Sequence, residues 1–241
     1  MTKHLIVFYG RTGSTLVDHH VSRNLCKPVF EFWNNGFESS EIHPDEYQMY
    51  YDKLFPLQIE WAMKYHVMTG THITPIPKKD YIVSLEDYIV NLDDTDKFFK
   101  DLKVTDLHFS FRIDCMDTIC SHMIAELDDT WVVTDNEVKK HEKRYIEPQY
   151  IRKTCDAFNL SYKIYNEYVK RYENNYNIEY YPYEKLYTKI DIDNDPRGMK
   201  KQLTKVEKQN LIENYDEVED IAKLYPFYHG TINEKNGILE V

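Results

Sequence analysis

The segment "HLIVFYGRTGSTLVDHH", residues 4–20, carries the clearest structural pattern in this 241-residue chain. Its first part, "HLIVFY", is a continuous apolar run with the length of a strand that is buried on both faces of a parallel sheet. A glycine-bearing turn follows, and Leu16, Val17 and Val21 then recur at helical spacing. A strand, a turn and a helix in this order predict a loop that holds an anion, because the turn amides and the helix N-terminus carry partial positive charge.

The rest of the chain predicts one α/β domain over residues 1–241. A second strand-like run lies at 105–113, and the apolar spacing predicts helices over 114–129 and 148–176. A strand ending in a turn over 178–186, and a helix with a loop over 204–225, complete the order. This alternation is typical of a mostly parallel central sheet flanked by helices, in which ligands bind beyond the carboxyl ends of the strands.

Charge and cysteine content limit the classes of partner. The net charge is −11, which argues against a general nucleic-acid-binding surface, so an anionic ligand must be met by a few local cations. No segment has the length and apolarity of a membrane span, and the oligomeric state is left open, with a homo-oligomer as one option. The cysteines show no CxxC spacing and predict reduced thiols in a cytoplasmic protein. They are Cys26, Cys115, Cys120 and Cys155.

The turn after the first strand is P-loop-like but lacks the features of a nucleoside-triphosphate P-loop. The pattern GxxxxGK[ST] requires glycine and lysine where this chain has Phe8 and Ser14, so no lysine bridges the β and γ phosphates. What the turn does offer is a short anion cradle, with the Arg11 cation at its mouth and a small residue, Gly13, in the turn. The Ser14 and Thr15 hydroxyls add direct donors. Taken alone, the turn also fits an ordinary strand–turn–helix junction.

Four segments together resemble one protein family. The loop "GRTGSTLV" is similar to the 5′-phosphosulfate loop of the sulfotransferases that use 3′-phosphoadenosine 5′-phosphosulfate (PAPS), especially the bacterial carbohydrate type. The run "FSFRIDCMDTICSHMIAEL" resembles the family's second signature, with Arg112, Asp114 and Ser121 at its matching positions. "YYPYEKL" is similar to a strand end of the family, and "KKQLTKVEKQNLIENYDEV" (200–218) to its C-terminal segment. The four segments occur in family order and span most of the chain.

The resemblance implies an enzyme that moves the sulfuryl group of PAPS to a hydroxyl of a carbohydrate or small-molecule acceptor, by in-line transfer and without a metal. The resemblance implies that Arg112 and Ser121 grip the 3′-phosphate, although Ile113 stands where some family members have a second arginine. A C-terminal stretch with Lys201 would close over the nucleotide, or alternatively forms a solvated basic face. The implied cofactor-binding residues are Arg11, Thr12, Gly13, Ser14, Thr15, Arg112, Ser121 and Lys201.

The reaction also needs a base for the acceptor hydroxyl. The resemblance points to Glu31 in "KPVFEFW", whose aromatic neighbours favour a raised pKa by desolvation. His20 is the second candidate, although it falls on the apolar face of the loop helix. Arg11 would stabilise charge on the sulfuryl group and the leaving phosphate. Two alternatives stay open, which are a nucleotide or small-molecule kinase with a degenerate loop and a non-catalytic nucleotide-binding protein with the sulfotransferase fold.

Overall fold

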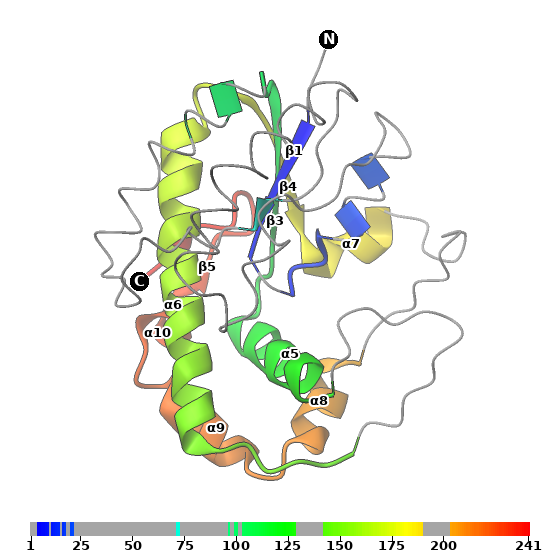
Figure 1. The fold of residues 1–241 in the computed structure, drawn as a ribbon, viewed down its shortest axis with the longest axis vertical. Helices are drawn as coiled ribbons and strands as arrows, with labels where there is room; N and C mark the ends of the chain where they lie inside the picture. The colour runs from blue at the N-terminus through cyan, green and yellow to red at the C-terminus, as the bar shows by residue number, and fades with distance from the viewer. Residues whose placement is uncertain are drawn as a thin grey trace, which may run out of the picture. The chain divides into compact units, whose positions relative to one another are not determined.

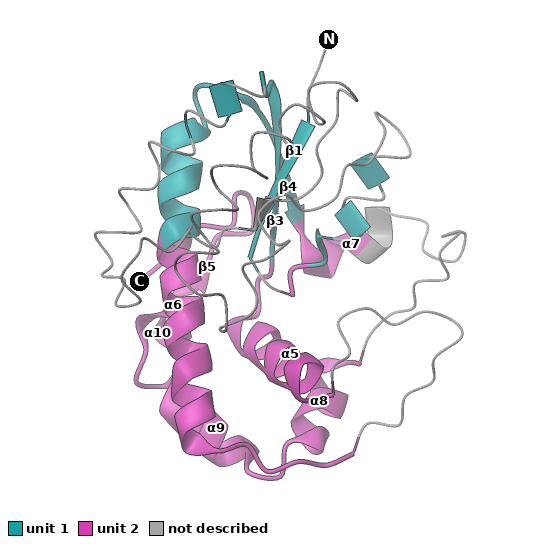
Figure 2. Cartoon of the chain, in the orientation of Figure 1, with its two compact units in different colours: residues 1–9, 13–111, 164–181 teal, residues 10–12, 112–163, 182–241 magenta. Residues whose placement is uncertain are grey.

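The structure is a computed structural model, and it describes part of the chain. The described residues are 4–9, 11–14, 16–17, 20–21, 71–72, 96, 99–100, 103–128, 142–189 and 203–241. They separate into two compact units that are both discontinuous in sequence (Figure 2). Unit 1 comprises 1–9, 13–111 and 164–181, and unit 2 comprises 10–12, 112–163 and 182–241. The chain therefore crosses between the units several times, and neither corresponds to one half of the sequence.

Unit 1 is built on a sheet with the strand order β2-β1-β3-β4, of which β1, β3 and β4 are labelled in Figure 1. The strands are β1 (His4–Phe8), β2 (Thr71–His72), β3 (Asp106–Phe111) and β4 (Asn177–Pro182). β1 is parallel to β2 and to β3, with Phe8 opposite His72 on one side and Ser110 on the other. The prediction of an α/β fold with parallel strands is confirmed at this level. All five residues of β1 are buried, as its continuous apolar run predicted.

The long helix α6 (Pro148–Tyr172) supplies aromatic packing to unit 1. The Tyr165 ring lies 5.5 Å from the ring of Phe109 and 5.6 Å from that of Tyr9, edge-on in both cases. Edge-to-face pairs of this kind add to the burial of the rings themselves. The helix ends four residues before the predicted boundary at 176, and the Asn175 side chain donates to the carbonyl of Arg171 in its last turn.

Unit 2 holds α5 (Cys115–Leu127), α7 (Tyr183–Lys189), α8 (Lys205–Leu211), α9 (Tyr215–Ala222) and α10 (Pro226–His229). α5 and α8 are in contact and lie side by side in Figure 1. Asp114 caps the N-terminus of α5, and Thr204 with Glu207 forms a capping box at the start of α8. A small antiparallel hairpin, β5 (Thr231–Ile232) with β6 (Leu239–Glu240), follows α10.

Two predictions of local structure were wrong in unit 2. The segment 183–186 was expected to finish a strand and turn, but helix α7 begins at Tyr183. Pro182 has no amide proton to continue strand pairing, and Glu184 places an acidic side chain in the first helical turn, where it is favourable. The segment 204–225 was expected to be one helix with a loop, but it contains α8 and α9, separated at 212–214.

A buried chain of polar side chains crosses the sheet of unit 1. His4 Nδ1 lies 3.0 Å from His108 Nε2, and His108 Nδ1 lies 3.2 Å from the Tyr181 hydroxyl. Because that hydroxyl donates to Glu179, it accepts from His108 Nδ1, and the Nε2 lone pair then accepts from His4. Neutral His108 thus satisfies both ring nitrogens. Burial, and secondly the neighbouring His4, lower the pKa of His108 from 6.5 to about 4.

This buried histidine predicts an acid-sensitive unit 1. Between pH 6.5 and about 4 the unfolded chain binds a proton at His108 that the folded chain does not. The free energy of unfolding should therefore fall as pH falls through this window, by at most about 3 kcal/mol from this group. Chemical unfolding of wild type and His108→Phe at several pH values measures the effect. The expected result is a flatter pH dependence for the variant, and parallel curves would contradict it.

Candidate anion site in unit 2

The loop after β1 has an unusual backbone at Arg11. Arg11 and Gly13 both have positive φ, at 66° and 76°. Glycine adopts this conformation at no steric cost, whereas arginine is held there only by surrounding structure, which is a feature of functional sites. The amides of Leu16 and Val17 donate to the Gly13 carbonyl at 2.9 and 3.1 Å, so helical bonding begins directly after the turn. Leu16, Val17 and Val21 are buried, in line with the predicted apolar face.

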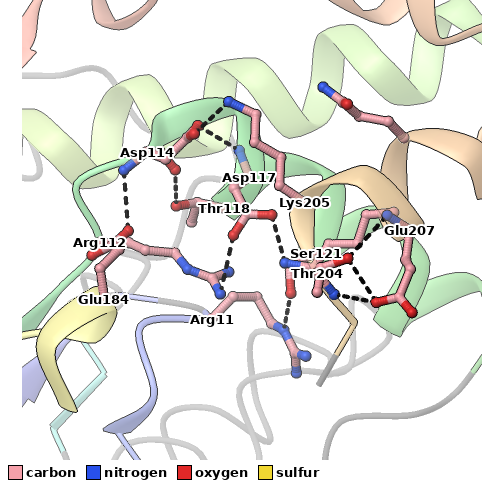
Figure 3. A network of polar contacts seen from close by, with 12 residues as sticks. Arg11, Arg112, Asp114, Asp117, Thr118, Ser121, Glu184, Thr204, Lys205 and Glu207 are labelled. Carbon is pink, nitrogen blue, oxygen red and sulfur yellow. Dashed lines mark hydrogen bonds and ion pairs between the residues drawn. The ribbon is translucent and has the colours of Figure 1, made fainter. Parts of the chain in front are cut away.

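Arg11 reaches a residue that lies 110 positions away in the sequence. Its Nε donates to the Ser121 Oγ at 3.2 Å (Figure 3). Ser121 is a buried residue of α5, and both residues belong to unit 2. The first predicted segment and the second therefore meet through side chains that both suit phosphate or sulfate oxygens.

Arg112 follows β3 directly, and its side chain is 2% exposed. One end of its guanidinium is 3.2 Å from Asp117, in the first turn of α5. Its central carbon lies 3.8 Å from the centre of the Tyr183 ring, where a cation is attracted to the aromatic face. These contacts hold the guanidinium by its edge and by its face.

The turn that carries Arg112 is also held from α7. The Glu184 carboxylate accepts from the amide of Ile113 at 3.0 and 3.1 Å and from the amide of Asp114 at 3.3 Å. Asp114 in turn accepts from the amide of Asp117 at 2.9 Å and so caps α5. The segment "YEKL" thus contributes Tyr183 to the guanidinium and Glu184 to the backbone beside it.

Two lysines of α8 complete the network of polar contacts, of which Lys205 is labelled in Figure 3. Lys205 pairs with Asp114 at 2.5 Å, and Lys208 pairs with Asp117 at 2.6 Å. The Lys205 ion pair is about half exposed and raises the lysine's pKa. Lys208 is buried instead, and burial together with the nearby Arg112 lowers its pKa. Two buried cations, Arg112 and Lys208, therefore share the carboxylate of Asp117.

The structure places the predicted site residues unevenly. Arg11 contacts Ser121, and Arg112 contacts Asp117, which lies one turn before Ser121 on α5. Thr12 is buried in unit 2, whereas Gly13 and Ser14 belong to unit 1. His20 also belongs to unit 1, half-buried, with its ring 6.1 Å from that of Tyr181. Thr15, Glu31 and Lys201 lie outside the described residues.

Three functional candidates were missed by the sequence reasoning. One feature of the sequence could have indicated Asp117 and Lys208. Asp117 follows Asp114 by three residues, and Lys208 follows Lys205 by the same spacing. His122, next to Ser121 on α5, had none. Its Nε2 lies 3.1 Å from the Glu126 carboxylate, and its pKa is lowered by burial and, to a smaller extent, by the nearby Arg11 and Lys153 cations.

The described cysteines do not provide a nucleophile. Burial raises the pKa of Cys115 to about 11 and those of Cys120 and Cys155 to about 12, so these thiols stay protonated at neutral pH. All three are free thiols, as predicted. Cys26 lies outside the described residues.

Comparisons with protein-family models, with curated proteins and with solved structures found no match to this chain. Within the described ranges, no group of three or more His, Cys, Asp or Glu side chains is arranged to hold a metal ion. None of the helices in the described part of the chain has the length and apolarity needed to cross a bilayer.

Proposed function

We propose that this protein is a PAPS-dependent sulfotransferase that acts on a hydroxyl acceptor. The observation that carries the proposal is the hydrogen bond from Arg11 Nε to Ser121 Oγ. It joins the two segments that the family resemblance assigns to the two phosphate ends of one nucleotide. The other two segments contact the second of these, Tyr183 and Glu184 at Arg112 and Ile113, and Lys205 and Lys208 at Asp114 and Asp117.

The charges of unit 2 suit this chemistry. A chain with net charge −11 repels a polyanionic nucleotide unless cations are concentrated locally. In the proposed reaction the acceptor oxygen forms a bond to sulfur, while the bond from sulfur to the 5′-phosphate oxygen breaks and the acceptor proton passes to a base. Positioning and electrostatic stabilisation supply most of the catalysis in transfers of this type. Arg11 would stabilise the charge on the transferring group.

Ligand-induced stabilisation tests the proposal. Adenosine 3′,5′-bisphosphate, the expected product, should stabilise the protein in EDTA, by about 2.7 kcal/mol at a hundred times its Kd. Radiolabelled PAPS with a panel of hydroxyl acceptors then tests sulfate transfer. Stabilisation that requires Mg-ATP would favour a kinase, and stabilisation without transfer would favour a non-catalytic nucleotide-binding protein. Absence of any nucleotide effect contradicts all three.

Ser121→Ala should weaken the bisphosphate by about 10- to 100-fold while weakening adenosine 5′-phosphate much less, because a hydrogen bond to a charged phosphate is lost. The measurement is the Kd of both nucleotides by titration calorimetry. Ser161→Ala is the matched control, because the Ser161 hydroxyl donates only within α6, to the carbonyl of Ala157. Equal losses for the two nucleotides would mean that Ser121 does not distinguish the 3′-phosphate.

A further inference from the structure

The carboxylate of Asp117 links two buried cations that come from different parts of the chain. Its Oδ2 lies 3.2 Å from Arg112, directly after β3, and its Oδ1 lies 2.6 Å from Lys208 of α8. Both cations are 2% exposed, and Asp117 itself is largely buried. Such a bridge is far less screened than a surface ion pair. Asp117, which contacts Arg112, is therefore itself held by Lys208, which lies 91 positions further along the chain.

The neighbouring ion pair provides an internal comparison. Lys205 and Asp114 repeat the same spacing one turn earlier on both helices, but this pair is exposed. An exposed ion pair contributes little to stability, whereas removing one partner of a buried pair leaves a charge without compensation. Asp117 also contacts the Arg112 guanidinium directly, at 3.2 Å. Of the two carboxylates, Asp117 is therefore the one placed to orient Arg112.

We propose that Asp117 is a positioning residue that orients Arg112 for binding of a phosphate group, and that Lys208 holds Asp117 in place from α8. The inference rests on the proposed function for the identity of the ligand, namely the 3′-phosphate of the nucleotide. Asp117 and Lys208 act through Arg112 and need not touch the ligand. A guanidinium held at one end by a carboxylate and on its face by Tyr183 is fixed in orientation, which lowers the entropic cost of gripping phosphate oxygens.

The test compares nucleotide selectivity in matched variants of the full chain. Asp117→Asn should lower affinity for adenosine 3′,5′-bisphosphate by about tenfold and leave adenosine 5′-phosphate nearly unchanged. Lys208→Met should act in the same direction with a smaller effect, and the control Lys223→Met, which removes an exposed ion pair of α9, should stay within about twofold of wild type. A structural lesion would weaken both nucleotides, so the ratio of the two Kd values reports on positioning. An unchanged ratio in Asp117→Asn overturns the inference.

Two further measurements keep the test decisive. If Asp117→Asn does not fold, the test uses the double variant Asp117→Asn/Lys208→Met in its place, because this variant removes both charges of the pair. A double-mutant cycle adds Arg112→Ala, after which Asp117→Asn should cost no further affinity; additive losses overturn the inference. If wild type binds neither nucleotide but binds inorganic phosphate in a manner that depends on Asp117, the sulfotransferase proposal fails and this inference stands. No binding of nucleotide or phosphate contradicts both.

Discussion

Arg112→Lys is expected to lower affinity for adenosine 3′,5′-bisphosphate by about 10- to 150-fold while the protein stays folded. The loss corresponds to about 1.5–3 kcal/mol, the contribution of a charge-assisted hydrogen bond. Lysine keeps the positive charge beside Asp117, so the buried carboxylate keeps its compensation and the fold is preserved. It loses the planar fork that can bind two phosphate oxygens at once, and the face that stacks on Tyr183.

The control for this substitution is Arg144→Lys. Arg144 belongs to the same unit, but its guanidinium pairs with Asp128 at 2.8 Å, at the C-terminal end of α5, whereas Arg112 pairs with Asp117 in the first turn of that helix. Calorimetric Kd values for the bisphosphate and for adenosine 5′-phosphate, with melting temperatures, separate binding from stability. An Arg112→Lys variant that binds the bisphosphate as tightly as wild type would remove Arg112 from the proposed phosphate site.

Local sequence pattern was enough to predict the elements that frame this site. After His4, the run "HLIVF" has no polar residue at the alternate positions where a half-exposed strand would need one, and all of β1 is buried. Six apolar residues recur at helical spacing over this helix, namely Met116, Ile119, Cys120, Met123, Ile124 and Leu127. The first four are buried in α5, whereas Ile124 is half-buried and Leu127 is exposed. In these segments the local pattern of apolar residues predicts the type of element and most of its buried side chains, so no information on distant contacts is required.

The contacts between distant segments could not be predicted in the same way. Nothing near Asp117 in the sequence indicates that its partner is Lys208, because the pairing depends on how α8 docks on α5. The same holds for α7, where the aromatic run "YYPY" favours a strand by intrinsic preference. In the structure a helix begins at Tyr183 instead, and Glu184 in its first turn accepts a hydrogen bond from the Ile113 amide. The assignments of Thr15, Glu31 and Lys201, outside the described residues, stay predictions.

Glu31→Gln is expected to cut the single-turnover rate of sulfate transfer by about 10²- to 10⁴-fold, the range for loss of general-base help. The bisphosphate Kd and the melting temperature should be unchanged, because glutamine keeps the shape of the side chain and no phosphate contact is assigned to Glu31. In the sequence its neighbours are the aromatic residues Phe30, Phe32 and Trp33, which is the pattern that led to the choice of Glu31 as the base. Single-turnover assays with saturating PAPS measure the chemical step apart from product release.

Two histidine variants decide whether the base has been assigned correctly. His20 packs edge-on against Tyr181 in unit 1, so His20→Ala should lower the melting temperature more than the rate. His122, paired with Glu126 beside Ser121, is the titratable group that unit 2 offers instead. An oriented histidine–carboxylate pair is a recurring arrangement for a general base, and loss of Glu126 would then reduce the rate as well. If Glu31→Gln keeps its activity while His122→Gln and Glu126→Gln lose it at unchanged melting temperature, the proton acceptor is on α5 and the assignment to Glu31 is wrong.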